Sequence, residues 1–600
     1  MIRLCQDTRM RNGSHVRPRK HKMEGLLSDG EGRIRGIILI VFCVGALLAL
    51  RLYFIQVMSH DKWVAIAEDQ HNAFQELAAD RGEIYMRDGD GRYPLAVNRE
   101  YSLAYVVPRD VVEKDRVTLE LSRILGMDAV VIRTKLDIPD DPFEIIKKRL
   151  TDDEVRQIKE MDLKGVALFP EKYRYYPAGE LASQVVGFAS LGEIGGAGGY
   201  GIEAFQNGRL RGEGGTVSQE KDAGGRWIPL SDRALVSPKN GDSMVLTLDR
   251  VIQYETEKIL REAMERHSAD RATAIVMDPQ TGAILAMASQ PQFDPNRYSE
   301  IEDYSVFLNP AVSLTYEPGS IMKPITMAIG IENGKVSPDT EYVDTGVVRE
   351  SGYAIRNSED KVYGRSTMTR VLDESINTGV IFVEKQVGNQ TFRDYFTRFG
   401  FGKKTDVALP AELAGNVRNL DNPRTNLEFF TAAFGQGVAV TPLQMITAYA
   451  VLANGGVLYK PQIIERIIHS DGSEEKTAPQ EVRRILSEET SRTISGMLRS
   501  VVVNGHGKRA DVPGYLVGGK TGTAQVAKSD GRGYEEGQSI GSFVGYAPID
   551  DPRFVVLVKI DNPKDVQWAE SSAAPTFGQI MRFLLEYARI RPTEQATANK

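Results

Sequence analysis

The sequence predicts an α+β protein with one N-terminal membrane helix and at least two domains beyond it. Its 600 residues exceed what a single hydrophobic core usually holds, and 42% of them are apolar. Residues 36–57 form a nearly unbroken apolar stretch, which is long enough to cross a bilayer as a helix. Beyond it, segments with strand periodicity and segments with helix periodicity are mixed along the chain.

The apolar stretch is expected to be an uncleaved anchor. Residues 1–35 form a tail rich in arginine and lysine, which the positive-inside rule places in the cytoplasm, so that everything after Met58 lies outside. A cleavable signal peptide is the alternative, but no small-x-small site follows the stretch, which is also longer than a signal core. Both cysteines, Cys5 and Cys43, precede the exported part, which is therefore not expected to contain a disulfide.

The exported part is expected to divide at the polar, turn-rich link 237–241. Residues 58–236 would form an elongated, non-catalytic pedestal of mixed strands and helices, residues 237–590 a catalytic domain, and residues 591–600 a flexible tail. Periodicity predicts strands at 102–107, 244–248, 274–277, 284–288, 542–546 and 554–560, and helices at 152–161, 250–266 and 577–589.

Three short strings far apart in the chain contain the parts of an acyl-transfer site that uses lysine as its base. They are Ser320-Ile321-Met322-Lys323, Ser375-Ile376-Asn377 and Lys520-Thr521-Gly522-Thr523. A serine nucleophile needs a neighbour to take its proton, and positions i and i+3 share one face of a helix. Each string alone is weak, because exposed Ser-x-x-Lys pairs are common. Their order and their expected contexts favour a shared site: a turn into a helix, the middle of a helix, and a strand.

In this order the strings resemble those of penicillin-binding proteins and serine β-lactamases. The sequence is most similar to the class B penicillin-binding proteins, which are monofunctional peptidoglycan transpeptidases. Further segments that carry this likeness are 316–320, 277–288, 293–296, 435–444 and 520–525. Upstream, Arg81-Gly82-Glu83, Arg174 to Gly179 and Gly201-Ile202-Glu203 resemble motifs of that family's pedestal domain. The resemblance runs from about Ile34 to about Leu585.

The resemblance implies a transpeptidase domain with an antiparallel sheet flanked by helices, and a serine mechanism. Ser320 would attack the penultimate D-alanine of a donor stem peptide and Lys323 would accept its proton. Ser375 would relay that proton towards the leaving nitrogen, and Asn377 would bind the donor amide. Burial and the charge of Lys520 would lower the pKa of Lys323.

The strand that carries Lys520 is implied to hold the donor peptide. Thr521 and Thr523 would bind its carboxylate, while Gly522 would let the peptide backbone come close. The oxyanion hole would consist of the N–H groups of Ser320 and Thr523. No metal or organic cofactor is expected.

In the pedestal, Arg81, Gly82, Arg174 and Glu203 are expected to be structural. We expect the charged members to form a buried network that fixes the shape of the module and takes no part in catalysis.

The resemblance also implies partners: peptidoglycan stem peptides, β-lactams as covalent inhibitors, a membrane glycosyltransferase of the FtsW/RodA type, and other division proteins. The net charge of −7 argues against a nucleic-acid partner. The short 187–201 segment, the Ser-Ile-Asn triplet and the short connection before Ser375 favour a septal role. The end of the chain soon after the last predicted helix is expected for the shorter members of the family. Alternatives are an elongation-type transpeptidase, an anchored β-lactamase or D,D-carboxypeptidase, and a division scaffold.

Two other motif matches are rejected. Residues 196–201 fit the dinucleotide pattern G-x-G-x-x-G, but no repeated βαβ pattern surrounds them. Residues 537–541 fit the nucleophile elbow G-x-S-x-G, which needs a strand before it and a helix after it. A polar, glycine-rich loop and a strand are expected there instead.

Overall fold

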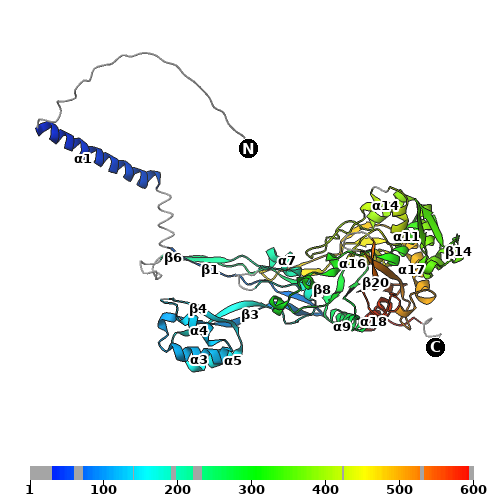
Figure 1. Cartoon of the computed structure of the whole chain (residues 1–600), viewed down its shortest axis with the longest axis horizontal. Coiled ribbons are helices and arrows are strands. Elements are labelled where there is room, and N and C mark those ends of the chain that lie inside the picture. The colour runs from blue at the N-terminus through cyan, green and yellow to red at the C-terminus, as the bar shows by residue number, and fades with distance from the viewer. Residues whose placement is uncertain are drawn as a thin grey trace, which may run out of the picture. The chain divides into compact units, whose positions relative to one another are not determined.

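The computed structural model describes residues 30–59, 72–139, 141–190, 197–220, 233–421, 424–527 and 533–593. The chain divides into two compact units (Figure 1). The first comprises the chain up to Glu76 together with Thr216–Val236, and the second comprises Leu77–Gly215 and Ser237–Lys600. Most of the basic tail lies outside the described residues.

The first unit contains the apolar helix. Helix α1 spans Gly30–Tyr53 and continues as a π-helical turn, η1, over Phe54–Met58. Within the described ranges, Ile34–Met58 is the one helix long and apolar enough to cross a membrane. The N-terminal apolar helix predicted from the sequence is therefore confirmed. A three-stranded sheet of order β1-β6-β7 joins Asn72–Leu77, Gly215–Glu220 and Arg233–Val236.

The second unit contains a seven-stranded mixed sheet of order β17-β16-β8-β2-β3-β4, in which β5 also pairs with β3. In that order the strands are Glu474–Lys476, Ile464–Ile468, Ser243–Asp249, Ile84–Asp88, Gly91–Val106 and Glu144–Leu150, with β5 at Val166–Tyr175. Strand β8 pairs in parallel with β2, with Ile84 opposite Met244, and antiparallel with β16. The sheet thus joins strands from both sides of the link at 237–241.

Three helices cover the β3–β4 end of this sheet: α3 (Lys114–Leu125), α4 (Ala129–Leu136) and α5 (Asp152–Met161). Helix α5 begins with a complete capping box, in which Thr151 and Glu154 each bond the other's backbone N–H. Apolar side chains from all three helices and from the strands form one buried cluster. The helix predicted at 152–161 is confirmed.

A five-stranded antiparallel sheet of order β10-β9-β21-β20-β19 forms the centre of the C-terminal region. Its strands are Ile284–Gln290, Arg271–Met277, Phe554–Asp561, Tyr534–Ala547 and Gly518–Ala527. Ala274 and Val276 face one apolar cluster, while Ile275 and Met277 face the other, as strand alternation requires.

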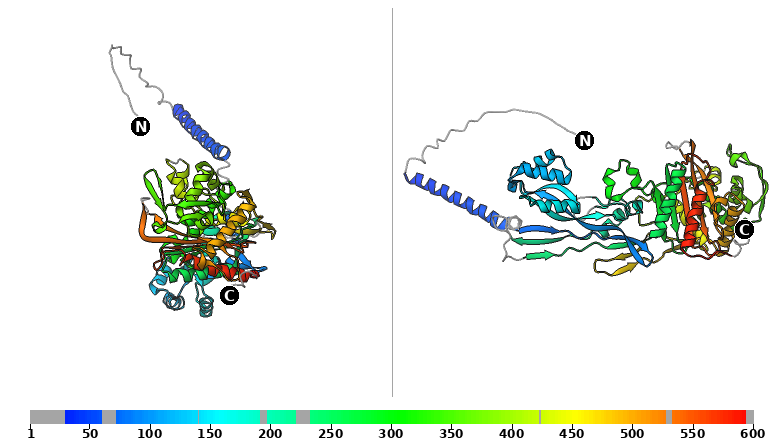
Figure 2. Two further views of the ribbon diagram at one scale, coloured as in Figure 1. Left: turned by 90° about the vertical axis from the view of Figure 1, so that its right-hand side faces the viewer. Right: turned by 90° about the horizontal axis from the view of Figure 1, so that it is seen from below.

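Helices cover both faces of this sheet (Figures 1 and 2). Helices α9 (Arg250–Arg266) and α18 (Ala573–Tyr587) pack together on one face. Helix α16 (Pro442–Ala453) lies on the other, where α11 (Lys323–Glu332) and α17 (Glu488–Val503) pack against it. The predicted antiparallel sheet flanked by helices is confirmed.

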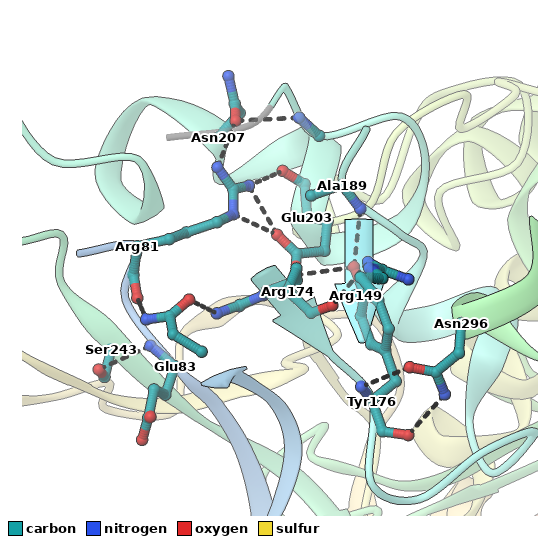
Figure 3. Close-up of polar contacts among 12 residues, drawn as sticks. Arg81, Glu83, Arg149, Arg174, Tyr176, Ala189, Glu203, Asn207, Ser243 and Asn296 are labelled. Atoms are coloured by element: carbon teal, nitrogen blue, oxygen red, sulfur yellow. Dashed lines mark hydrogen bonds and ion pairs between the residues drawn. The ribbon is translucent and has the colours of Figure 1, made fainter. Parts of the chain in front are cut away.

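The pedestal motifs meet in one buried network (Figure 3). Glu203 is fully buried, and each of its carboxylate oxygens accepts a hydrogen bond from an arginine. Arg81 Nε donates to Oε2 at 2.7 Å and Arg174 Nε donates to Oε1 at 2.6 Å. Gly82 is needed nearby, because a Cβ there would lie 1.9 Å from the carbonyl oxygen of Asp242.

The network also reaches the C-terminal region. The Tyr176 hydroxyl donates to Glu203 Oε1 at 3.3 Å. The backbone of Tyr176 exchanges two hydrogen bonds with the side chain of Asn296, at 3.0 and 2.9 Å (Figure 3). Asn296 lies within the 293–296 segment that carries the family likeness. The buried charges of the pedestal are therefore two contacts away from Asn296 in the C-terminal region.

Candidate active site

The predicted nucleophile lies on a tightly held turn. Ser320 belongs to a 3₁₀ turn, η5 (Gly319–Met322), which runs directly into α11. The N–H of Gly319 donates to the carbonyl of Gly435 at 3.0 Å, and the buried Tyr449 hydroxyl donates to the carbonyl of Ile321 at 2.8 Å. Gly319 has a φ of +60°, a conformation that other residues rarely adopt. Neighbouring segments therefore fix the turn that presents Ser320.

Lys323 is fully buried at the first position of α11. Its Nζ donates to the carbonyl of Ser375 and, at 3.1 Å, to Ser375 Oγ. Among the described residues its hydrogen bonds go to Ser375, and none goes to Ser320. Burial, and then the nearby charge of Lys520, lower the pKa of Lys323 well below its ordinary value. A lysine in this state is suited to accept a proton.

Ser375 and Asn377 do not lie in the middle of a helix, so this part of the prediction is wrong. Helix α12 (Met368–Asp373) ends before them and α13 (Asn377–Val387) begins after Ile376. The φ of Ser375 is +55°, which is incompatible with a continuous right-handed helix. The break turns Ser375 towards Lys323 and places Asn377 at the start of α13, where its Nδ2 donates to the carbonyl of Arg356 at 2.9 Å.

The third string lies on β19, as predicted, and β19 is an edge strand of the five-stranded sheet. Lys520 is fully buried and donates to the carbonyl and hydroxyl oxygens of Thr521, at 3.2 and 3.3 Å. Burial lowers the pKa of Lys520 to about 7, against the raising effect of the carboxylates of Asp373 and Glu570. The hydroxyl of Thr523 accepts from the N–H of Ala569 at 3.1 Å.

Gly522 brings the strand and the serine turn together. A Cβ at this position would lie 2.9 Å from the carbonyl oxygen of Pro318 and 2.9 Å from a methyl group of Ile321. The glycine therefore lets η5 pack directly on β19. The sequence predicts that Gly522 lets a bound peptide come close, whereas in the structure this glycine is already required by contact within the chain.

The strings meet at one cleft of about 960 Å³. Ser320, Ser375, Asn377, Thr521 and Thr523 line it, while Lys323 and Lys520 are buried. The arrangement offers a hydroxyl nucleophile, a buried amine with a lowered pKa, a second hydroxyl bonded to that amine, and an open strand edge. These are the parts that acyl transfer requires.

The sequence predicted no role for several residues around the cleft. Glu317 accepts from the Gly437 N–H and from the Tyr534 hydroxyl, both at 3.0 Å. It thereby joins the serine turn to the start of β20. Glu317 lies in the 316–320 segment, so the sequence did contain a signal for it. His506, which bonds Glu570 at 3.3 Å, lines the same cleft without any local motif.

Neither rejected motif forms the site that its pattern describes. Residues 537–541 lie inside β20, so no strand-to-helix elbow surrounds Ser539. The glycine-rich match at 196–201 begins outside the described residues, and Gly201 starts the short helix α7 (Gly201–Phe205). Among the described residues, no group of three or more potential metal ligands comes together.

Comparison with known proteins gives concordant matches. Residues 272–582 match the family described as the penicillin binding protein transpeptidase domain, and residues 76–246 match the penicillin-binding protein dimerisation domain. Stage V sporulation protein D of Bacillus subtilis is 35% identical over 577 residues, covering 94% of this chain and 88% of the relative. Peptidoglycan D,D-transpeptidase FtsI of Escherichia coli is 28% identical, covering 93% of both chains.

A solved structure is similar throughout its length. Penicillin binding protein 3 of Mycobacterium tuberculosis, crystallised with aztreonam, superimposes with a TM-score of 0.67 at 28% identity. The match covers 86% of this chain and 98% of that one.

Proposed function

Because this chain belongs to the class B penicillin-binding proteins, we propose that it cross-links peptidoglycan stem peptides through an acyl-enzyme on Ser320, during septal wall synthesis. The observation that carries the chemical part is the pairing of Lys323 with Ser375 beside the Ser320 turn. A fully buried amine with a lowered pKa, bonded to a second hydroxyl, is a base and a proton relay in one unit.

The proposed first step transfers the acyl group to the enzyme. Ser320 Oγ bonds to the penultimate D-alanine carbonyl carbon, and its proton passes to Lys323. The bond from that carbon to the terminal D-alanine nitrogen breaks, and Ser375 passes the proton from Lys323 to this nitrogen. In the second step an acceptor amine attacks the ester carbonyl carbon and forms the cross-link, the bond from that carbon to Ser320 Oγ breaks, and one amine proton passes through Lys323 back to Ser320 Oγ. Backbone N–H groups of Ser320 and Thr523 would stabilise both oxyanions.

Strand β19 is proposed to hold the donor peptide. As an edge strand it has unpaired backbone groups, which can pair with an extended peptide. The Thr521 and Thr523 hydroxyls would bind the donor carboxylate, and Asn377 its amide. The same surface would bind β-lactams, and penicillin binding protein 3 of Mycobacterium tuberculosis has been crystallised with aztreonam.

The chain is proposed to be a single-pass membrane protein with its N-terminus in the cytoplasm. The apolar helix at Ile34–Met58 supports one crossing, and the basic residues before it support the orientation. The cleft would then face the compartment that contains peptidoglycan. We expect the anchor and the pedestal to contact a membrane glycosyltransferase of the FtsW/RodA type, together with other division proteins.

Mass spectrometry of the full-length protein in detergent tests the chemistry. Incubation with penicillin should add one intact drug mass to the peptide containing Ser320, and the adduct should persist for many minutes. Ser320→Ala should abolish the adduct without lowering the melting temperature, because the change removes one partly exposed hydroxyl. Ser539→Ala is the matched control, since Ser539 also lines the cleft. Labelling at Ser539 would contradict the proposal, and rapid turnover would assign the chain to the β-lactamases.

Depletion in the host tests the septal role. We expect filamentous cells, because elongation continues when septal cross-linking stops. A catalytically inactive Ser320→Ala copy should not restore division, whereas wild type should. Round cells would instead assign the protein to elongation. A defect confined to spore formation would match the name of the Bacillus subtilis relative.

A further inference from the structure

Lys520 is a buried amine that makes no ion pair with the described residues. It is fully buried, and among the described residues no carboxylate lies within ion-pair distance of its Nζ. Its hydrogen bonds go to the two oxygens of Thr521, which are neutral. Burying an unpaired charge is costly, so a charge of opposite sign close by is needed to retain the ammonium form.

Asp373 is a buried carboxylate with an unused oxygen. It is the last residue of α12, two positions before Ser375, and is 9% exposed. Its Oδ2 accepts from the Ser500 hydroxyl on α17 at 2.9 Å. Its Oδ1 is buried and has no hydrogen-bond partner among the described residues. Such an oxygen is expensive to bury unless a nearby charge compensates.

The backbone holds Asp373 in this place. The carbonyl of Asp373 accepts from the N–H of His506 at 3.3 Å. A Cβ on Gly505 would lie 2.4 Å from that carbonyl oxygen, so this close contact requires a glycine. Helix α17 packs against both α12 and β19, and it therefore brings the Asp373 end of α12 to the strand that carries Lys520.

We propose that Asp373 is a positioning residue of the transpeptidation site: its carboxylate, held by Ser500 beside the turn of Ser375, is the counter-charge that keeps Lys520 an ammonium ion. The inference rests on the proposed function of Ser320 and Lys323. It connects three charges in sequence. Asp373 stabilises the cation at Lys520, and the cation at Lys520 disfavours a second cation at Lys323, which leaves the base free to accept a proton.

The electrostatic directions agree with this geometry. Burial lowers the pKa of Lys520, and the Asp373 and Glu570 carboxylates raise it. Burial raises the pKa of Asp373; the Ser500 hydrogen bond and the charge of Lys520 lower it, and Glu374 raises it. From the loop after α17, His506 also faces this region, bonded to Glu570 at 3.3 Å and 4.0 Å from Glu374.

Asp373→Asn in the full-length protein tests the proposal, with the rate of penicillin acylation measured as a function of pH. The amide keeps the shape and can still accept from Ser500, but it removes the charge. The profile of rate against pH should have an acid limb and an alkaline limb. We expect the alkaline limb, where Lys520 loses its proton, to move to lower pH by about one unit. The acid limb, where Lys323 loses its proton, should move to higher pH. At pH 7.5 the rate should fall about tenfold.

Two control variants separate charge from structure. Ser500→Ala removes the hydrogen bond and keeps the carboxylate, so it should displace both limbs less than Asp373→Asn does. Asp373→Glu keeps the charge and should leave the limbs closer to wild type than Asp373→Asn does. Equal displacement of the limbs by Glu and Asn would overturn the proposal. If the Asn variant folds poorly, the Asp373→Glu profile can still be compared with wild type, and limbs displaced by about one unit although the charge is kept would overturn the proposal.

The outcomes distinguish this proposal from the function on which it rests. Wild type that is not acylated on Ser320 contradicts the proposed function. Wild type that is acylated there, with an Asp373→Asn profile that falls in height without moving along the pH axis, refutes the counter-charge alone and leaves Asp373 a structural residue.

Discussion

Lys323→Ala should slow penicillin acylation of Ser320 by about 10³-fold. The variant removes the amine proposed to accept the serine proton, and it also frees the Ser375 hydroxyl that the amine holds at 3.1 Å. Rates are measured by incubating the full-length protein with a fluorescent penicillin and stopping the reaction at successive times. Lys335→Ala is the matched control, because Lys335 is exposed just after the same helix.

Lys323→Arg decides between a base and a fixed charge. A guanidinium retains the positive charge but does not lose its proton in proteins. If Lys323 is the base, Arg should be as slow as Ala. An Arg variant with wild-type rates would show that only the charge matters.

In wild type the acylation rate should rise with pH as Lys323 loses its proton. The midpoint should lie well below the pKa of a free lysine, because burial and Lys520 lower the pKa of Lys323.

Glu203→Ala should destabilise the protein more than the loss of one of its two arginine partners. It leaves the guanidiniums of Arg81 and Arg174 buried without their shared carboxylate, and breaking a buried pair typically costs about 3–5 kcal/mol. We expect the melting temperature of the full-length protein to fall by roughly 10 °C. Glu180→Ala is the control, because that carboxylate is more than half exposed.

Arg174→Ala should cost less, since Glu203 would keep Arg81 as a partner. A Glu203→Ala protein with the melting temperature of wild type would show that the network does not stabilise the fold.

The same network predicts sensitivity to acid. Burial acts to raise the pKa of Glu203, but Arg174 and Arg81 outweigh it, so the pKa lies below its ordinary value. A lowered folded-state pKa gives stability that is fully present above the unfolded-state pKa, near 4.3, and is lost as the pH falls through the folded value. Wild type should therefore lose more stability between about pH 5 and pH 3 than Glu203→Gln.

The sequence predicted much of the fold because its signals were local. Helices α5 and α9 span the residues expected for them, since their apolar periodicity lies within each segment and the N-caps, Thr151 and Asp249, come directly before it. The order and spacing of the three strings also predicted a shared site, and in the structure Ser320, Ser375 and Thr523 line one cleft. Motifs of this kind carry information about distant contacts that periodicity does not contain.

The remaining features depend on contacts between distant segments. Serine gives no signal for the positive φ at Ser375, because that conformation is imposed by packing rather than by residue type. Asp373 and His506 are placed near the cleft by α17, which bonds Asp373 through Ser500 and ends just before His506. The sequence of α17 shows only an amphipathic helix. The partner of β8 was equally hidden, since a buried strand reads the same whichever strand it pairs with.

The pairing of β8 with β2 and β16 limits how genes for such chains can recombine. A crossover near residue 237 would combine the C-terminal region of one parent protein with strand β2 of the other. The register that sets Ile84 opposite Met244 joins residues on both sides of that junction. A one-residue mismatch would turn every side chain of one strand to the opposite face. Recombined genes should therefore give folded proteins where both parents share the residues of this sheet, or where the exchanged segment begins after Asp249 and leaves β16 unchanged.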